Sequence, residues 1–290
     1  MQIINALEPL REAVGAIRSG KPGGKVALVP TMGALHAGHI ALITAARAQA
    51  DAVVASIFVN PRQFGANEDL AAYPRQLARD AEMLAAAGCD LLWAPDAAAM
   101  YPAGYATNIS VSGVSEGLCG GARPGHFDGV ATVVCKLFNQ VRPDLALFGE
   151  KDWQQLAVIR RMARDLDLSQ PHVDQIIGVP TIREADDLAM SSRNAYLTAQ
   201  ERAAAAALPA AMRAAIARIE AGAPVAEALA DLTAQLRTGG FANIDYAELR
   251  DAETLAPLTA ASTPARLRVA ARIGKARLID NMAVAALTTG

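Results

Sequence analysis

Short apolar runs alternate with amphipathic stretches along the first two-thirds of the chain. The runs 26–30 and 52–60 contain few polar residues, which is typical of strands buried on both faces. Between them, residues 39–50 place apolar side chains at spacings of three and four, which predicts a helix. Parallel strands need a crossover of this kind, so the pattern predicts a strand–helix–strand unit of about 35 residues.

The same alternation continues to about residue 180. Further helices are expected over 74–87, 127–141 and 152–166, and further strands over 90–94, 107–111, 145–148 and 173–179. Strands that alternate with helices in this way form parallel sheets with helices on both faces. The sequence therefore predicts a Rossmann-like, doubly wound α/β domain over residues 1–183.

The pattern changes after about residue 184. Thr198 and Glu201 form a capping-box signature that opens a long Ala-rich helix to about residue 222, and a second helix is expected over 225–237. Three short β-like segments follow, over 246–250, 267–273 and 276–279, and Gly274-Lys275 suits a hairpin turn. Residues 184–290 are therefore expected to form a smaller α+β C-terminal domain.

Composition narrows the class of protein. Of 290 residues, 52% are hydrophobic and 19% charged, so the chain can bury a core. The net charge of -2 gives no electrostatic footprint for nucleic acid or anionic lipid. Apolar runs end well before the roughly 20 residues that a membrane span needs. Glu8, Arg11 and Glu12 interrupt the region where a signal peptide would be apolar, so a cytoplasmic protein is expected.

The chain has three cysteines and no CxxC motif, so any disulfide scheme leaves one cysteine unpaired. Structural thiols in a reducing compartment are the favoured interpretation. A zinc site is a disfavoured alternative, because the Cys and His spacings match no familiar ligand pattern. The residues concerned are Cys89, Cys119, Cys135, His36, His39, His126 and His172.

The loop after the first predicted strand carries the first candidate chemistry. Residues 30–39 read PTMGALHAGH, which is neither a G-x-G-x-x-G fingerprint nor a P-loop with its lysine. His36 and His39 straddle the start of the next helix, where backbone N–H groups attract anions. For an isolated H-x-x-H, capping and packing roles are the usual explanation. The position directly after a buried first strand favours phosphate binding instead.

Polar side chains also follow two later strands. Asn60 and Gln63 are neutral amides after the second strand, although Asn-Pro alone is only a turn signal. Lys151 can reach a phosphate, whereas Asp152 alone would be explained as a helix N-cap. Gln155 lies one helical turn further on. These residues suit a small polar ligand beside a phosphate group.

Two further segments stay ambiguous from the residues alone. Residues 190–194 read MSSRN, which suits a phosphate clamp or an ordinary surface turn. Residues 120–127 are rich in glycine and proline and carry Arg123 and His126. They predict an irregular, mobile loop that serves as a lid or as a plain linker.

Taken together, the motifs PTMGALHAGH, FVNPRQFG, RPGHFDGV, LFGEKDWQQL and READDLAMSSRN resemble, in this order, those of the pantothenate synthetase (pantoate–β-alanine ligase) family. The resemblance spans at least residues 26–197. The H-A-G-H run is also similar to the HxGH signature of the nucleotidyltransferase superfamily. Two departures are Ala37, where the family often has Glu, and residues 185–187, ADD in place of a more usual PDG, which puts the turn before Met190 in doubt.

The resemblance implies an AMP-forming ligase. ATP and pantoate would give a pantoyl adenylate and pyrophosphate, and β-alanine would then displace AMP to give pantothenate. It implies that His39 is the proton donor, with His36 and Lys151 also catalytic. Gln63 would contact pantoate and β-alanine, Gln155 would contact pantoate, and Asn60 is a further substrate-site candidate.

The resemblance also implies the nucleotide site and the state of the protein. Mg²⁺ would be held largely by the phosphates, with no protein ligand assigned, and the protein would be a cytoplasmic homodimer. ATP would be surrounded by Met32, Gly33, Ala34, Leu35, His36, Ala37, Gly38, His39, Gly149, Glu150, Lys151, Asp152, Ile182, Met190, Ser191, Ser192 and Arg193.

Two other functions compete with the ligase. A nucleotidyltransferase acting on a phosphorylated acceptor would call for cations where Asn60, Gln63 and Gln155 stand, and a tRNA synthetase fragment would call for a basic surface. A nucleotide-binding regulatory module without turnover would tolerate loss of His36, His39 or Lys151, and all three are present. The ligase is therefore favoured.

Overall fold

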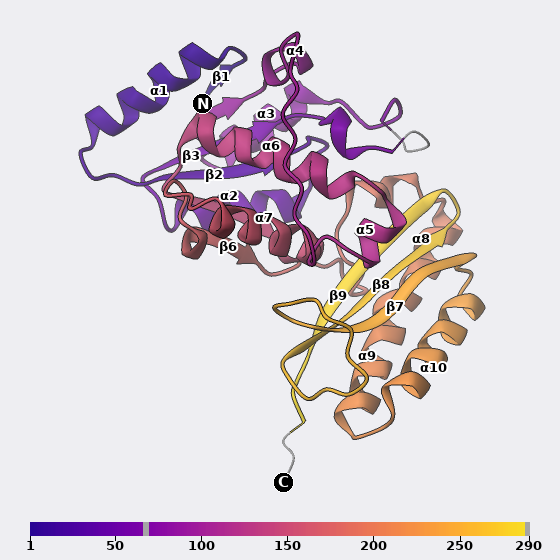
Figure 1. The fold of residues 1–290 in the computed structure, drawn as a ribbon. Coiled ribbons are helices and arrows are strands. Elements are labelled where there is room, and N and C mark those ends of the chain that lie inside the picture. The colour runs from indigo at the N-terminus through magenta and orange to yellow at the C-terminus, as the bar shows by residue number, and fades with distance from the viewer. Residues whose placement is uncertain (66–69, 288–290) are drawn as a thin grey trace. The chain divides into compact units, whose positions relative to one another are not determined.

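The computed structural model describes residues 1–65 and 70–287. Its larger sheet has six parallel strands in the order β1-β4-β3-β2-β5-β6. Figure 1 labels β1, β2, β3 and β6 of this sheet. The bounds of the strands are β1 Gln2–Ile4, β2 Val26–Thr31, β3 Ala52–Ile57, β4 Leu91–Trp93, β5 Leu145–Gly149 and β6 Ile176–Val179. The chain crosses from β2 to β3 on one side and from β5 to β6 on the other, which makes the sheet doubly wound and Rossmann-like, as predicted.

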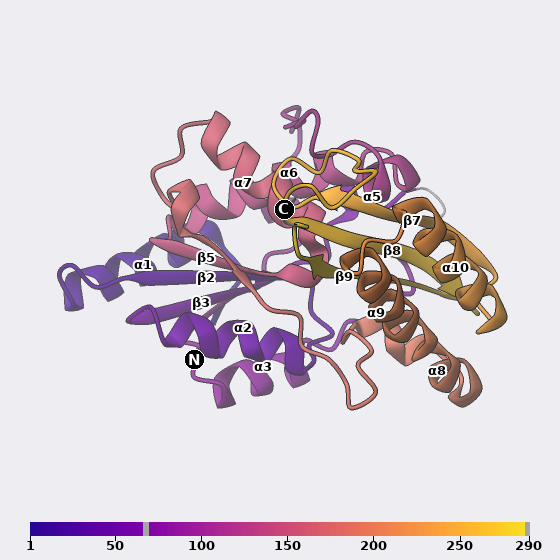
Figure 2. The ribbon, with the colours of Figure 1, turned by 90° about the horizontal axis from the view of Figure 1, so that it is seen from below.

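Helices cover both faces of this sheet. Figure 2 shows α2 and α3 on one face and α6 and α7 on the other. The apolar face of α2 packs on the sheet through Leu42 and Ile43, against strand residues such as Val29 and Val53. The helices of this region are α1 Leu7–Gly20, α2 Ala37–Arg47, α3 Leu77–Ala86, α4 Ala97–Met100, α6 His126–Val141 and α7 Trp153–Asp165.

The prediction for residues 107–111 is wrong. No strand forms there, because the segment binds a helix rather than a strand edge: the backbone N–H of Ile109 donates to Oγ1 of Thr132 in α6, at 2.9 Å. The sequence interpretation also assigned no elements to the N-terminus, where β1 and α1 form. With only three residues, β1 is too short for periodicity to reveal.

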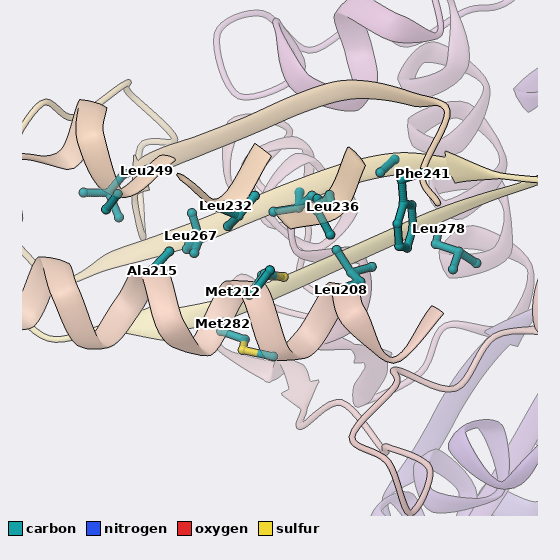
Figure 3. Close-up of a cluster of buried hydrophobic side chains, with 14 of the residues drawn as sticks. Leu208, Met212, Ala215, Leu232, Leu236, Phe241, Leu249, Leu267, Leu278 and Met282 are labelled. Atoms are coloured by element: carbon teal, nitrogen blue, oxygen red, sulfur yellow. The ribbon is translucent and has the colours of Figure 1, made fainter. Parts of the chain in front are cut away.

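The smaller sheet is antiparallel, in the order β7-β8-β9, and α9 and α10 cover one of its faces. Figure 3 shows the core between them, where Met212 and Leu232 from the helices meet Leu267 and Met282 from the strands. The bounds are α5 Leu118–Ala122, α8 Ala199–Ala205, α9 Ala207–Glu220, α10 Val225–Thr238, β7 Asn243–Asp251, β8 Ala265–Ile273 and β9 Ala276–Val284. The fold class is thus α/β with a smaller α+β part.

The predicted single helix over 198–222 is divided into α8 and α9. Pro209 lies in the first turn of α9 and has no N–H to donate to the carbonyl of Ala205, so the helix is interrupted before it. The capping box is present: Oγ1 of Thr198 accepts the N–H of Glu201 at 3.3 Å, and the Glu201 carboxylate accepts the N–H of Thr198 at 2.8 Å.

The chain divides into two compact units. The N-terminal unit comprises residues 1–115, 123–150 and 155–180, and the C-terminal unit comprises 116–122, 151–154 and 181–290. Residues 116–122 and 151–154 thus belong to the C-terminal unit, although along the chain they lie between segments of the N-terminal unit. Within the described ranges, no helix is both long and apolar enough to cross a membrane.

Candidate active site

The N-terminal unit offers the ligand position expected of an open parallel sheet. Strand β2 pairs with β3 on one side and with β5 on the other, so the direction of winding reverses between β2 and β5. Ligands of such sheets bind beyond the carboxyl ends of the strands at that point. Met32–His36 follow β2, and Gly149 and Glu150 stand at the end of β5.

The loop after β2 is held in an unusual conformation by one buried carboxylate. Gly33 and Ala34 both have left-handed backbones, with φ of 83° and 52°. Asp80 of α3, 1% exposed, accepts the N–H of Ala34 at 2.8 Å and that of Leu35 at 2.9 Å. A Cβ on Gly33 would stand 3.0 Å from the Asp80 carboxylate, so glycine suits this position in both conformation and space.

His36 and His39 cap α2, and that fixes their tautomers. Nδ1 of His36 accepts the N–H of Gly38 at 3.1 Å, and Nδ1 of His39 accepts the N–H of His36 at 3.2 Å. An Nδ1 that accepts carries no proton, so each neutral ring has its proton on Nε2. The ring centroids lie 4.1 Å apart. The capping explanation considered for one histidine therefore holds, and it places the proton of each neutral ring on Nε2.

The loops after β2 and β3 are joined by side chains. Nε2 of Gln63 donates to Sδ of Met32 at 2.8 Å, while Nδ2 of Asn60 donates to Oε1 of Gln63 at 3.1 Å. Asn60 also donates to the carbonyl of Gly129 at 3.1 Å and accepts the hydroxyl of Tyr101 at 2.9 Å. With an exposed fraction of 1%, Asn60 serves to orient the Gln63 amide.

The main chain of Gln63 is held as tightly as its side chain. Its carbonyl accepts from Nδ1 of His126 at 2.8 Å and from the Arg123 guanidinium at 3.2 Å, and Arg123 in turn donates to Nε2 of His126 at 3.0 Å. A Cβ on Gly129 would lie 2.3 Å from the Arg62 carbonyl oxygen, so glycine alone lets α6 pack on this turn. The expected irregular loop over 120–127 is wrong in part, because residues 118–122 are helical and Arg123 and His126 bind Gln63.

In the C-terminal unit, Lys151 and Asp152 form a 3-10 turn with Glu150 directly before α7. The side chain of Lys151 is 19% exposed, and its Nζ lies 3.6 Å from the Asp152 carboxylate. The Lys151 carbonyl accepts from Nδ2 of Asn281 in β9 at 2.9 Å. Gln155, in α7, belongs to the N-terminal unit.

The segment with Ile182 and Met190–Arg193 begins as a narrow hairpin. The N–H of Met190 donates to the carbonyl of Ile182 at 3.0 Å, and Arg183 pairs with Ala189. The turn forms with Asp187 at a φ of 70°, a conformation that Asp adopts more readily than most residues. Oγ of Ser191 then accepts the N–H of Arg193 at 3.2 Å and starts a 3-10 turn.

Several residues that shape these segments were missed from the sequence. Asp80 stands in a plain amphipathic helix, Tyr101 lies in no motif, and Gly129 lies inside the motif RPGHFDGV but had no role assigned to it. Their hydrogen-bond partners are 41 to 69 positions away. Asn281 likewise acts on a segment 130 positions away. No local sequence pattern reports such contacts between distant residues.

The three cysteines bear on whether the protein could hold a metal. Cys89, Cys119 and Cys135 are free and buried, and burial raises the pKa of the Cys89 thiol to about 11. Among the described residues, no group of three or more His, Cys, Asp or Glu side chains could hold a metal ion.

A doubly wound parallel sheet with an H-x-G-H helix start directly after β2 is the architecture of a nucleotide-binding α/β protein. The family model for pantoate-beta-alanine ligase matches residues 2–283. The chain is 68% identical to the pantothenate synthetase of Novosphingobium aromaticivorans, over 98% of this chain and 99% of that protein. Identity to the pantothenate synthetase of Sphingopyxis alaskensis is 59%, over 98% and 100%.

Comparison with solved structures gives the same family. Pantothenate synthetase from Thermus thermophilus superposes with a TM-score of 0.90 at 47% identity, covering 97% of this chain and 99% of that one. The pantoate-beta-alanine ligase of Francisella tularensis, solved with beta-gamma ATP and beta-alanine, gives 0.80 at 34% identity, covering 97% of each chain. This chain belongs to the pantoate–β-alanine ligase family.

Proposed function

We propose that the chain carries out its family's reaction with the residues that follow its strands and with the 182–193 segment. The reaction is the ATP-dependent condensation of pantoate with β-alanine. The pantoate carboxylate attacks the α-phosphate of ATP, which gives pantoyl adenylate and releases pyrophosphate. The β-alanine amine then attacks the acyl carbon, AMP leaves, and pantothenate is formed.

The hydrogen bonding of the two histidines is the observation that supports this proposal most directly. Negative charge develops on the leaving phosphate oxygens in the first step, and positioned donors stabilise such charge. Because Nδ1 of His36 and of His39 each accepts a backbone N–H, the proton of each neutral ring is on Nε2. We assign both Nε2–H groups to the phosphates, so that His39 acts as a hydrogen-bond donor.

Gln63 is assigned to pantoate and β-alanine, and Gln155 to pantoate. The Gln63 amide is oriented from one side by Asn60 and from the other by Met32, so it can present fixed polar atoms to a small hydroxy acid. Asn60, whose amide is bonded to protein on both ends, acts on the substrates through Gln63. Neutral amides bind both the hydroxyl and the carboxylate of such a substrate.

The remaining assignments are made residue by residue from the family. Lys151, Ser191, Ser192 and Arg193 supply cations and hydroxyl donors for the phosphates, and Mg²⁺ enters with ATP, held by its phosphate oxygens. Residues 1–183 are proposed as the nucleotide- and pantoate-binding domain and 184–290 as the C-terminal domain, although residues 116–122, 151–154 and 181–183 group with the C-terminal unit. A cytoplasmic homodimer is proposed on the same basis. The other ATP contacts are Met32–Ala37, Gly38, Gly149, Glu150, Asp152, Ile182 and Met190.

The experiment measures pyrophosphate release from ATP with pantoate, and AMP formation with and without β-alanine. Pantoate-dependent release of pyrophosphate is expected, and its absence from folded protein would exclude the ligase function. Gln63→Ala is expected to raise the pantoate KM by about 10-fold or more, the cost of losing one or two hydrogen bonds, and to leave the ATP KM nearly unchanged. An equal rise in both constants would contradict the placement of Gln63.

A further inference from the structure

Two consecutive residues of β9, Asp280 and Asn281, bind the two segments of the C-terminal unit that carry proposed ATP ligands. Successive side chains of a strand point to opposite faces of a sheet. Asp280 lies opposite Val269, on the face that packs against the helices, and Asn281 lies opposite Arg268 on the other face. Both residues are 3% exposed, so each face of the sheet has one buried polar anchor at this point.

Asn281 holds the segment that carries Lys151. Its Nδ2 donates to the Lys151 carbonyl at 2.9 Å, and its Oδ1 accepts from Nη1 of Arg266 at 2.6 Å. The guanidinium carbon of Arg266 lies 3.4 Å from the ring centroid of Trp153. The indole N–H of Trp153 donates to the Ala252 carbonyl at 2.9 Å. The turn at 151–153 is therefore fixed through its main chain and through its aromatic ring.

Asp280 holds the segment that leads to Met190–Arg193. Its carboxylate accepts two bonds from the Arg183 guanidinium, at 2.7 and 2.9 Å. Such bidentate pairs fix orientation as well as distance. Arg183 also donates to the Asp187 carbonyl at 2.9 Å, across the hairpin that ends at Met190. One Asp280 oxygen accepts the N–H of Asn281 at 2.7 Å, which links the two anchors.

We propose that Asp280 and Asn281 are positioning residues for the adenylation step, since they hold Lys151 and the 190–193 segment in place without contacting ATP themselves. This rests on the proposed roles of Lys151 and Arg193. A displacement of about 1 Å in a group that stabilises the transition state lowers the rate by up to about 100-fold. Loss of either positioning residue is therefore expected to lower kcat for pyrophosphate release.

Isosteric variants test this proposal. Asn281→Asp keeps the acceptor for Arg266 and loses the donor to the Lys151 carbonyl, and Asp280→Asn loses the charge that binds Arg183. Each is expected to lower kcat for pantoate-dependent pyrophosphate release by about 10- to 100-fold, with the pantoate KM changed less than about 2-fold. Val284→Ala, a buried truncation on the same strand, controls for lost stability and is expected to keep the wild-type kcat per folded molecule.

A double variant separates positioning from general damage. If Asn281 acts through Lys151, then Asn281→Asp combined with Lys151→Ala is no slower than Lys151→Ala alone. The proposal would be overturned if the double variant lost as much rate as the product of the two single losses. It would also be overturned if Asn281→Asp were as fast as Val284→Ala. These outcomes differ from failure of the proposed function, in which the wild-type protein itself releases no pyrophosphate with pantoate.

Discussion

Two loops proposed to bind ATP are held in place by carboxylates in opposite ways. After β2, one carboxylate with 1% exposure, Asp80, binds two backbone N–H groups and fixes Ala34 and Leu35. In the 182–190 hairpin, the half-exposed carboxylates of Glu184 and Asp186 bind the Arg202 guanidinium. A buried donor or acceptor that loses its hydrogen-bond partner lowers the free energy of unfolding by about 1–3 kcal/mol. An exposed ion pair contributes less, because water screens it. Loss of the Asp80 contacts should therefore cost more than loss of the Arg202 contacts.

The largest effect is expected from His39, which lies in the first turn of α2, directly after the loop that Asp80 holds. His39→Asn places a carbonyl oxygen near the position of Nδ1, so it keeps the helix cap and loses the Nε2–H donor. Loss of one donor to developing charge lowers kcat by about 10²–10³-fold. Steady-state pyrophosphate release measures this, and unfolding by urea should show a nearly unchanged stability.

His39→Gln is the matched variant. Its amide N–H stands near the position of Nε2, so it keeps the donor and loses the acceptor that caps α2. It is expected to be the faster enzyme and the less stable protein, by about 0.5–2 kcal/mol for a lost cap. The reverse order of activities would show that His39 serves the fold alone.

A smaller effect is expected from Asp80. Asp80→Asn keeps one acceptor oxygen and turns an N–H donor toward a backbone N–H, which should cost about 1–3 kcal/mol in the free energy of unfolding. The same change should raise the ATP KM, because the loop before His36 loses its geometry. Glu82→Gln, an exposed change in the same helix, is the control and should leave both quantities unaltered.

The smallest effect is expected from Arg202, and it depends on pH. Hydrogen bonds from Arg202 hold the pKa of both Glu184 and Asp186 below their ordinary values. Carboxyl groups with lowered pKa stabilise the fold above their unfolded pKa, near 4, and lose that contribution as the pH falls through the folded pKa. Arg202→Met should therefore cost less than about 1 kcal/mol at pH 7, and this cost should shrink as the pH falls below about 4.

Arg218→Met provides the comparison for this measurement. It removes an ion pair with Asp231 on α9 and α10, away from the hairpin. Its stability loss should be similar, with the ATP KM unchanged, while Arg202→Met should raise that KM. Equal ATP KM values for the two variants would show that the hairpin does not contribute to ATP binding. A stability cost for Arg202→Met that stays constant as the pH falls below about 4 would contradict the ionic explanation.

Local pattern predicted much of this fold and left out the parts made by distant contacts. Buried runs located β2, β3 and β5, and the capping box at Thr198 located the start of α8. Residues 107–111 alternate like a strand, yet the N–H of Ile109 bonds to Thr132 in α6. The candidate site also combines residues found from local motifs with residues that act through distant contacts. Motifs indicated His36 and Gln63, but their supports come from residues that only the fold brings near.

The way the two histidines cap α2 has a consequence for metal chemistry. A ring nitrogen binds a transition metal through a lone pair, and here each Nδ1 lone pair is committed to a backbone N–H while each Nε2 carries the proton. To ligate zinc or nickel, the pair would have to break the start of its own helix or give up a proton. Binding of such an ion by either imidazole would therefore compete with the hydrogen bonds that cap α2.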